Sequence, residues 1–102
     1  MAKQAIGLLE TRGLCCLVSG IDAALKSANV ELAGPMKNVG SALCNAVIVG
    51  DVAAVKAGID AAAEAASQLG DVVSAHVIAR PDDAIDSVIS SSKAKPAARS
   101  KK

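Results

Sequence analysis

Apolar side chains follow two different periods along the first third of the chain. Residues 5–10 form a short apolar run that ends on a charge, which predicts a strand. Over residues 14–28 the apolar positions recur every three or four residues, which predicts an amphipathic helix. We expect Thr11 to cap the start of this helix and Asn29 to cap its end. A second strand is expected over residues 30–33, where Gly34 and Pro35 stop it.

The same alternation of strand and helix recurs in the second half of the chain. Residues 36–41 contain Gly40 and polar side chains, so a turn or loop is expected there. A mostly buried strand over residues 42–49 precedes Asp51, a favourable cap for a helix with an apolar stripe over residues 52–69. Gly70 is expected at the C′ position that ends this helix. A fourth strand over residues 72–78 and a short last helix, capped by Asp82 and reaching residue 89, complete the pattern.

This order of elements is β-α-β-β-α-β with a terminal helix. It predicts an α+β fold, a ferredoxin-like sandwich in which two helices cover one face of a single sheet. The chain has 102 residues, a length that fits one domain. We assign residues 1–89 to that domain and residues 90–102 to a basic, disordered tail.

Composition and charge restrict the partners of such a domain. The chain contains no Phe, Tyr or Trp, so it lacks the side chains on which nucleic-acid-binding folds stack bases. Six Lys and Arg residues stand against ten acids up to residue 89, whereas the segment after it holds five basic residues and no acid. We expect no nucleic-acid partner, and a basic tail that either solubilises the chain or contacts an anionic partner.

Neither a membrane span nor an export signal is predicted. The longest uncharged run, residues 38–50, is shorter than the ~20 residues needed to cross a bilayer. The N-terminal segment reaches charged residues too soon for a secretory signal. The three cysteines are odd in number and two are adjacent, which favours reduced thiols in a cytoplasmic protein.

No constellation of side chains predicts an enzyme. Ser41 and His76 lie outside any nucleophile elbow, and His76 is expected in the middle of a strand. The three cysteines and His76 lack the spacing of a metal site, so neither a metal nor a cofactor is expected. Residues 34–41 superficially resemble a phosphate-binding loop, but the glycine spacing is one residue too long and the lysine before the serine is missing. A turn that exposes backbone N–H groups is the better interpretation.

Four segments of the chain resemble bacterial microcompartment shell proteins. The stretch A-I-G-L-L-E-T-R-G-L is similar to the opening of that family, and the family's order continues with K-S-A-N-V, G-D-V-A-A-V-K-A and H-V-I-A-R-P. The resemblance covers about residues 5–89. It implies a BMC-domain fold with the same order of elements, and a shell subunit without catalytic activity that forms cyclic hexamers. Such hexamers tile edge to edge into the facets of a shell around cytoplasmic enzymes.

The same resemblance implies two groups of site residues. Lys26, Asn29 and Arg80 match the hexamer rim, where lysines of neighbouring hexamers pack together and the arginine donates hydrogen bonds to the neighbour's backbone. The turn between the second and third strands is implied to form a pore for small polar or anionic metabolites. This turn is one residue longer than in the commoner members, with Asn38 as the additional residue. The implied pore-lining residues are Lys37, Asn38, Val39, Gly40 and Ser41.

The expected partners are further copies of the chain, other shell proteins, enclosed enzymes and the metabolites that pass the pore. One alternative of another class stays open at this point: a regulatory module of the ACT or PII-like kind, which shares the ferredoxin-like topology. In such a module the loop at residues 34–41 would bind a small effector at a subunit interface. Those modules form dimers or trimers and do not tile, so the state of assembly distinguishes the two hypotheses.

Overall fold

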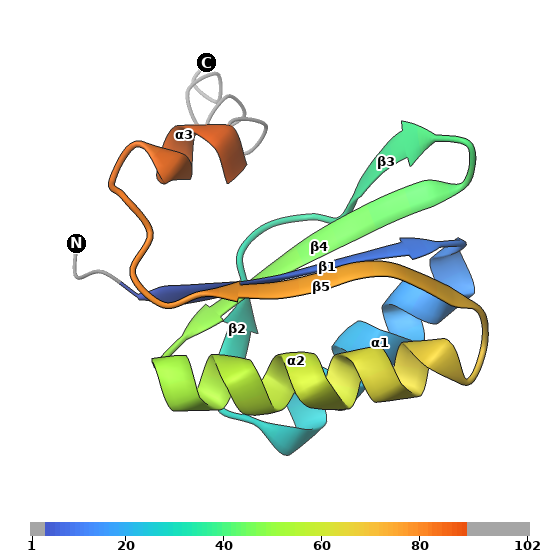
Figure 1. Ribbon diagram of the computed structural model, residues 1–102, viewed down its shortest axis with the longest axis horizontal. Helices are drawn as coiled ribbons and strands as arrows, with labels where there is room; N and C mark the ends of the chain where they lie inside the picture. The colour runs from blue at the N-terminus through green and yellow to red at the C-terminus, as the bar shows by residue number, and fades with distance from the viewer. Residues whose placement is uncertain (1–3, 90–102) are drawn as a thin grey trace, which may run out of the picture.

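The computed structural model describes residues 4–89, and the predicted tail lies outside them (Figure 1). Within these residues, two long helices cover one face of a five-stranded antiparallel sheet, and a short helix lies on the other side. This architecture confirms the predicted fold class, with one strand more than predicted. The elements are β1 (Ala5–Arg12), α1 (Leu14–Ser27), β2 (Val30–Leu32), β3 (Lys37–Gly40), β4 (Leu43–Gly50), α2 (Val52–Ser67), β5 (Asp71–Ile78) and α3 (Ile85–Ile89).

Strand β1 is the centre of the sheet. It pairs along its full length with β4, from Ala5 opposite Gly50 to Arg12 opposite Leu43, and it pairs with β5 on its other side. The order across the sheet is β2-β4-β1-β5, and β3 also pairs with β4. Within the described part of the chain, β5 therefore lies at one edge of the sheet, while β2 and β3 share the other.

The hydrophobic core lies between the sheet and the two long helices. Ala24 of α1 and Ala62 of α2 have no exposed surface, and a Cβ on Gly20 would lie 2.8 Å from the carbonyl oxygen of Ala62. Close contact through small residues explains how a chain with 22 alanines and no aromatic residue packs a core. The larger side chains that fill it come from all the facing elements: Leu9, Leu17, Ile48 and Val55.

The prediction of a loop at residues 36–41 is wrong, because most of that segment is strand β3. Lys37–Gly40 pairs with the first residues of β4, so the two strands form a hairpin. Its two-residue turn is Ser41 and Ala42, both with positive φ (53° and 64°), as a type I′ turn requires. Pairing with β4 overrides the local preference of Gly40 and its polar neighbours for irregular structure, because strand formation depends on the neighbouring strand.

The predicted caps of the first helix are also wrong. Strand β1 continues past Thr11, and Gly13 takes the N-cap position of α1 with φ 110°. Thr11 is instead fully buried, and its hydroxyl donates a hydrogen bond to the carbonyl oxygen of Gly13 at 3.0 Å. At the other end of α1, the C-cap is Ala28 rather than Asn29.

The second long helix begins where predicted and ends earlier. Asp51 is the N-cap of α2, although its side chain makes no capping hydrogen bond. Gly70 does not take a positive φ. A Cβ at this position would overlap with the Sγ atom of Cys16, so lack of space requires glycine here. Before α3, the carboxylate of Asp82 accepts a hydrogen bond from the backbone N–H of Ala84 at 2.9 Å, in the turn that leads into the helix. The capping of α3 itself by Asp82 stays a prediction.

Candidate functional site

The predicted pore residues are strand β3 and the first turn residue, Ser41, of the β3–β4 hairpin, at one end of the sheet (Figure 1). Lys37 is half-buried, whereas Asn38, Val39, Gly40 and Ser41 are exposed. No side chain of the turn itself carries a charge. Its polar features are therefore its backbone groups and the hydroxyl of Ser41.

Two contacts from the corner between β1 and α1 hold this turn in place. The N–H of Gly13 donates to the carbonyl oxygen of Ala42 at 2.7 Å. The Nη1 atom of Arg12 lies 3.5 Å from the carbonyl oxygen of Ser41. Gly13 can direct its N–H toward Ala42 because a residue without a Cβ adopts a φ of 110° with little steric strain. The turn is thus attached to the central strand of the sheet as well as to β4.

Lys37 contacts the C-terminal helix rather than the turn. Its ammonium donates a hydrogen bond to the carbonyl oxygen of Ile89 in α3 at 3.1 Å. Lys37 pairs with Asn45 of β4, Asn45 with Glu10 of β1, and Glu10 with Ser74 of β5. These four polar residues form a row across the face of the sheet that the long helices leave open. The row lines a cavity of ≈ 300 Å³ that also reaches α3.

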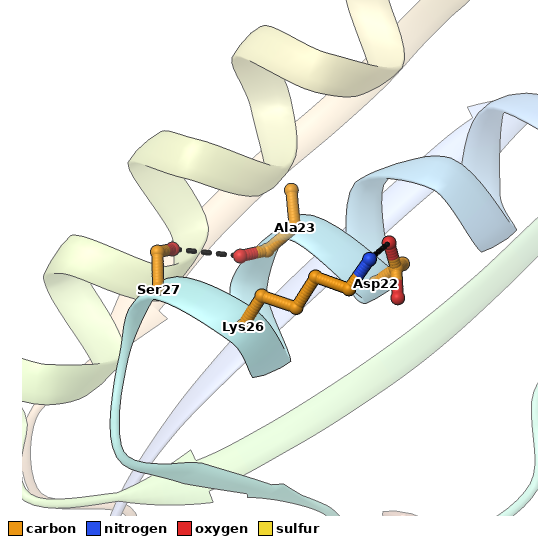
Figure 2. Close-up of polar contacts among 4 residues, drawn as sticks. All are labelled: Asp22, Ala23, Lys26 and Ser27. Atoms are coloured by element: carbon orange, nitrogen blue, oxygen red, sulfur yellow. Dashed lines mark hydrogen bonds and ion pairs between the residues drawn. The ribbon is translucent and has the colours of Figure 1, made fainter.

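The predicted rim residue Lys26 lies in the last turn of α1 (Figure 2). Its ammonium is 3.0 Å from the Oδ2 atom of Asp22, one helical turn earlier, and the two side chains are 75% and 56% exposed. The hydroxyl of Ser27 donates to the carbonyl oxygen of Ala23 at 2.6 Å. An ion pair as exposed as this one stabilises a helix by only about 0.3–0.5 kcal/mol. It orients Lys26 while leaving the ammonium accessible to another molecule.

The other two rim residues, Asn29 and Arg80, are exposed and lie at the end of the sheet away from the hairpin turn. Asn29 directly precedes β2, whose first residue pairs with Gly50 at the end of β4. Arg80 follows β5, whose last residue pairs with Ile6 near the start of β1. The turn lies beyond the last pair of β1 and β4 at the opposite end. Because a strand rises about 3.3 Å per residue, roughly 23 Å separates the two ends.

The residues considered for catalysis and metal binding are not brought together. Ser41 is in the turn, whereas His76 pairs with Leu8 in the middle of β1. Cys15 is exposed and the other two cysteines are buried. Among residues 4–89, no three His, Cys, Asp or Glu side chains lie close enough to hold a metal ion. None of the helices in that part of the chain combines the length and apolar character needed to cross a bilayer.

Sequence reasoning missed Arg12 and Gly13 as residues of the candidate site. In the chain they stand 29 residues before the turn that they contact. A glycine between a predicted strand and a predicted helix is a signal of unusual backbone conformation. Only the pairing of β1 with β4 shows which carbonyl groups lie within reach of this corner.

Comparison with known proteins assigns the chain to a family, because residues 5–81 match the BMC domain. The chain belongs to the BMC domain family. It is 48% identical over 85 residues to the bacterial microcompartment shell protein EutM of Salmonella typhimurium, covering 83% of this chain and 88% of EutM. It is 44% identical over 89 residues to PduA of Citrobacter freundii, with coverages of 87% and 95%. It is 39% identical over 87 residues to the carboxysome shell protein CcmK2 of a Synechocystis strain, with coverages of 83% and 84%.

A solved structure has the same fold as this BMC-domain protein. The crystal structure of a microcompartment protein from Desulfitobacterium hafniense superposes with a TM-score of 0.75 at 29% identity over 88% of this chain. The chain spans 48% of the length of that protein. The sequence relatives are shell proteins, which confirms the prediction of a structural shell subunit that is not an enzyme. The regulatory-module alternative is therefore set aside, while the individual pore and rim residues remain predictions.

Proposed function

We propose that this BMC-domain protein forms a ring of six identical chains, with the β3–β4 hairpin at the centre. Lys26, Asn29 and Arg80 then lie at the rim, where rings join edge to edge with one another and with other shell proteins. The central opening passes small polar or anionic metabolites to enzymes enclosed by the shell. The observation that carries the proposal is the placement of the turn and the rim residues at opposite ends of the same strands.

This placement suits a flat ring in which the strands radiate from the axis. One end of every sheet then faces the centre, and the other faces a neighbouring ring. The separation of roughly 23 Å keeps the two groups of contacts independent, because each depends on a different end of the strands. A change at the rim would accordingly alter tiling and leave the pore as it is.

Closing a ring requires two different surfaces on each chain, since every subunit binds one neighbour on each side. Exposed apolar side chains on two sides of the domain support such closure. Near α1, which packs over β2 and β4, Val18, Leu25 and Met36 line a mostly apolar cavity of ≈ 420 Å³. On the side of β5, Leu69 and Val73 are 61% and 46% exposed. Apolar surface of this extent favours association between copies.

The hairpin supports a narrow polar opening. Gly40, Ser41 and Ala42 at its tip are small and uncharged, so six copies can approach one axis closely. Backbone amides and the serine hydroxyl then surround the opening, which favours small polar or anionic solutes by size and by aligned donors. Asn38 and Val39 of β3 continue the wall of the pore, and Lys37 stands at its base.

Negative-stain electron microscopy and a light-scattering mass on the same sample test the assembly. Six chains of 10.1 kDa each give an expected mass of about 61 kDa. Rings with six-fold symmetry, or ordered sheets built from them, would support the proposal. A discrete dimer or trimer without sheets would contradict it.

The variant Lys26→Ala tests the rim separately. It removes an exposed ammonium and an ion pair of low energy, so the rings should persist while the sheets disappear. Lys56→Ala, which removes an exposed lysine from α2, is the matched control and should leave the sheets intact. Intact sheets from Lys26→Ala would contradict the rim assignment. Loss of the rings themselves would contradict the claim that Lys26 acts only between rings.

A further inference from the structure

The guanidinium of Arg12 is a positive charge held beside the hairpin turn. Arg12 is the exposed last residue of β1. Its neighbour Thr11 faces the helices and is fully buried, so alternation along the strand places Arg12 on the open face of the sheet. There its Nη1 atom reaches the carbonyl oxygen of Ser41 at 3.5 Å. The adjacent hydrogen bond from Gly13 to Ala42, at 2.7 Å, keeps this corner against the turn.

The second positive charge near the turn, the ammonium of Lys37, points toward α3 rather than toward the turn. Lys37 is the only charged residue of the hairpin segment 37–44. Its ammonium is bonded to the carbonyl oxygen of Ile89 in α3 at 3.1 Å, and three residues of β3 separate it from the turn. Arg12 therefore supplies, from a strand outside the hairpin, the formal charge that the turn itself lacks.

We propose that Arg12 determines the charge selectivity of the pore. This inference rests on the proposed six-membered ring with the turn at its centre. In that ring six guanidinium groups surround the mouth of the pore on the open face of the sheets. Positive charge around a narrow opening raises the local concentration of anions and lowers that of cations. The pore then favours small anionic metabolites, such as carboxylates and phosphate esters, over cations of equal size.

Asp71 provides the nearby counter-charge. It pairs with Arg12 across β1 and β5, and it is exposed. It lies one strand farther from the turn than Arg12, because β5 is on the side of β1 away from β4. Its carboxylate weakens the positive field at the mouth without reversing it. Replacing Asp71 by a neutral residue should consequently strengthen the preference for anions.

Ion permeability of the rings, reconstituted in planar lipid bilayers, measures this preference. The reversal potential across a potassium chloride gradient gives the ratio of chloride to potassium permeability. At about 0.1 M salt, where the screening length is roughly 10 Å, we expect Arg12→Gln to lower this ratio about threefold. Lys56→Gln removes one exposed positive charge from α2, on the other face of the sheet, and is the matched control, with an expected change below about 1.5-fold. Asp71→Asn should raise the ratio roughly twofold.

The outcomes separate the role of Arg12 from the proposed ring. An unchanged ratio in six-membered Arg12→Gln rings would overturn the role of Arg12 and leave the ring standing. A wild-type protein that forms a discrete dimer or trimer, with neither six-membered rings nor sheets, would overturn both. If Arg12→Gln forms no rings, Asp71→Asn decides: a higher ratio supports the inference, and an unchanged or lower ratio overturns it.

Discussion

Gly7 lies where α2 crosses the central strand and leaves no room for a side chain. A Cβ at this position would be 2.5 Å from Cγ1 and 2.8 Å from Cδ1 of Ile59, and 2.9 Å from Cγ1 of Val55. Carbon atoms in contact are normally about 3.5–4.0 Å apart. Val55 is fully buried and Ile59 is 5% exposed, so neither side chain can turn out into solvent. We predict that Gly7→Ala destabilises the protein.

The magnitude of this loss follows from two opposing effects. Separating α2 from the sheet by about 1 Å, or forcing Ile59 out of its rotamer, costs about 1–3 kcal/mol. Replacing glycine by alanine inside a strand returns about 0.5–1 kcal/mol, because alanine loses less conformational freedom on folding. The expected net loss in the free energy of unfolding is about 1–2 kcal/mol. For a domain of this size it corresponds to a melting temperature lower by roughly 5–15 °C.

Urea unfolding followed by far-ultraviolet circular dichroism measures this loss, since the chain has no aromatic residue to follow by fluorescence. All variants are compared at one protein concentration, because association between chains adds stability. Gly58→Ala is the matched control. A Cβ there would be 3.1 Å from Cδ1 of Ile48, the movable end of a side chain, and alanine stabilises a helix by about 1 kcal/mol relative to glycine. We expect Gly58→Ala to stay within about 1 kcal/mol of wild type.

The variant Ile59→Ala shows whether the clash with Ile59 is the cause. Alone it should cost about 2–4 kcal/mol, because it leaves a cavity in the core. Combined with Gly7→Ala, the total loss should be smaller than the sum by at least about 1 kcal/mol, because the new methyl group occupies space that Ile59 has left. Strictly additive losses, or a Gly7→Ala variant as stable as wild type, would refute this explanation.

Three further predictions concern single contacts. Thr11→Val removes the buried hydroxyl that donates to the carbonyl oxygen of Gly13, and it should cost about 1–2 kcal/mol in urea unfolding; an unchanged midpoint would contradict this. Gly70→Ala should overlap with the Sγ atom of Cys16 and lower the melting temperature, and adding Cys16→Ala should recover part of the loss, which scanning calorimetry can check. Lys37→Met keeps the apolar stem but removes the hydrogen bond to α3, so amide hydrogen exchange of residues 85–89 should accelerate while that of the sheet does not. Equal exchange in wild type and variant would show that Lys37 does not hold α3.

The order of the main elements could be predicted from the sequence, because the spacing of apolar residues within each segment indicates a helix or a strand without reference to the rest of the chain. In α1 and α2 apolar residues recur at helical spacing, which predicts the helices. The buried residues of α2 largely follow that stripe, whereas in α1 three of its apolar positions, Leu14, Val18 and Leu25, are exposed. The apolar segments that became β1, β4 and β5 were equally clear, since each lies between polar or glycine-rich stretches. This order is sufficient for the fold class, and the four family-like segments were sufficient for the shell-protein family.

The predictions that were wrong all concern residues whose structure depends on another part of the chain. Lys37–Gly40 is a strand because β4 is beside it, and nothing within that segment alternates strongly enough to show it. Threonine is a residue type that often caps helices, but Thr11 lies in β1. Its hydroxyl there donates a hydrogen bond to the carbonyl oxygen of Gly13, between β1 and α1. Gly70 follows a helix as C′ glycines do. A glycine is required there, however, because a Cβ would overlap with the Sγ atom of Cys16.

For the candidate site too, some features follow from the sequence and others only from the tertiary structure. By itself, the sequence determined which residues resemble a pore turn and a rim, since those are short motifs in one stretch of chain. Tertiary structure alone decided that the two groups lie at opposite ends of the sheet. It also decided that Lys37 reaches α3 while Arg12 reaches the turn. The physical reason is that strand register and the position of a side chain across a sheet are set by hydrogen bonds between segments far apart in the chain.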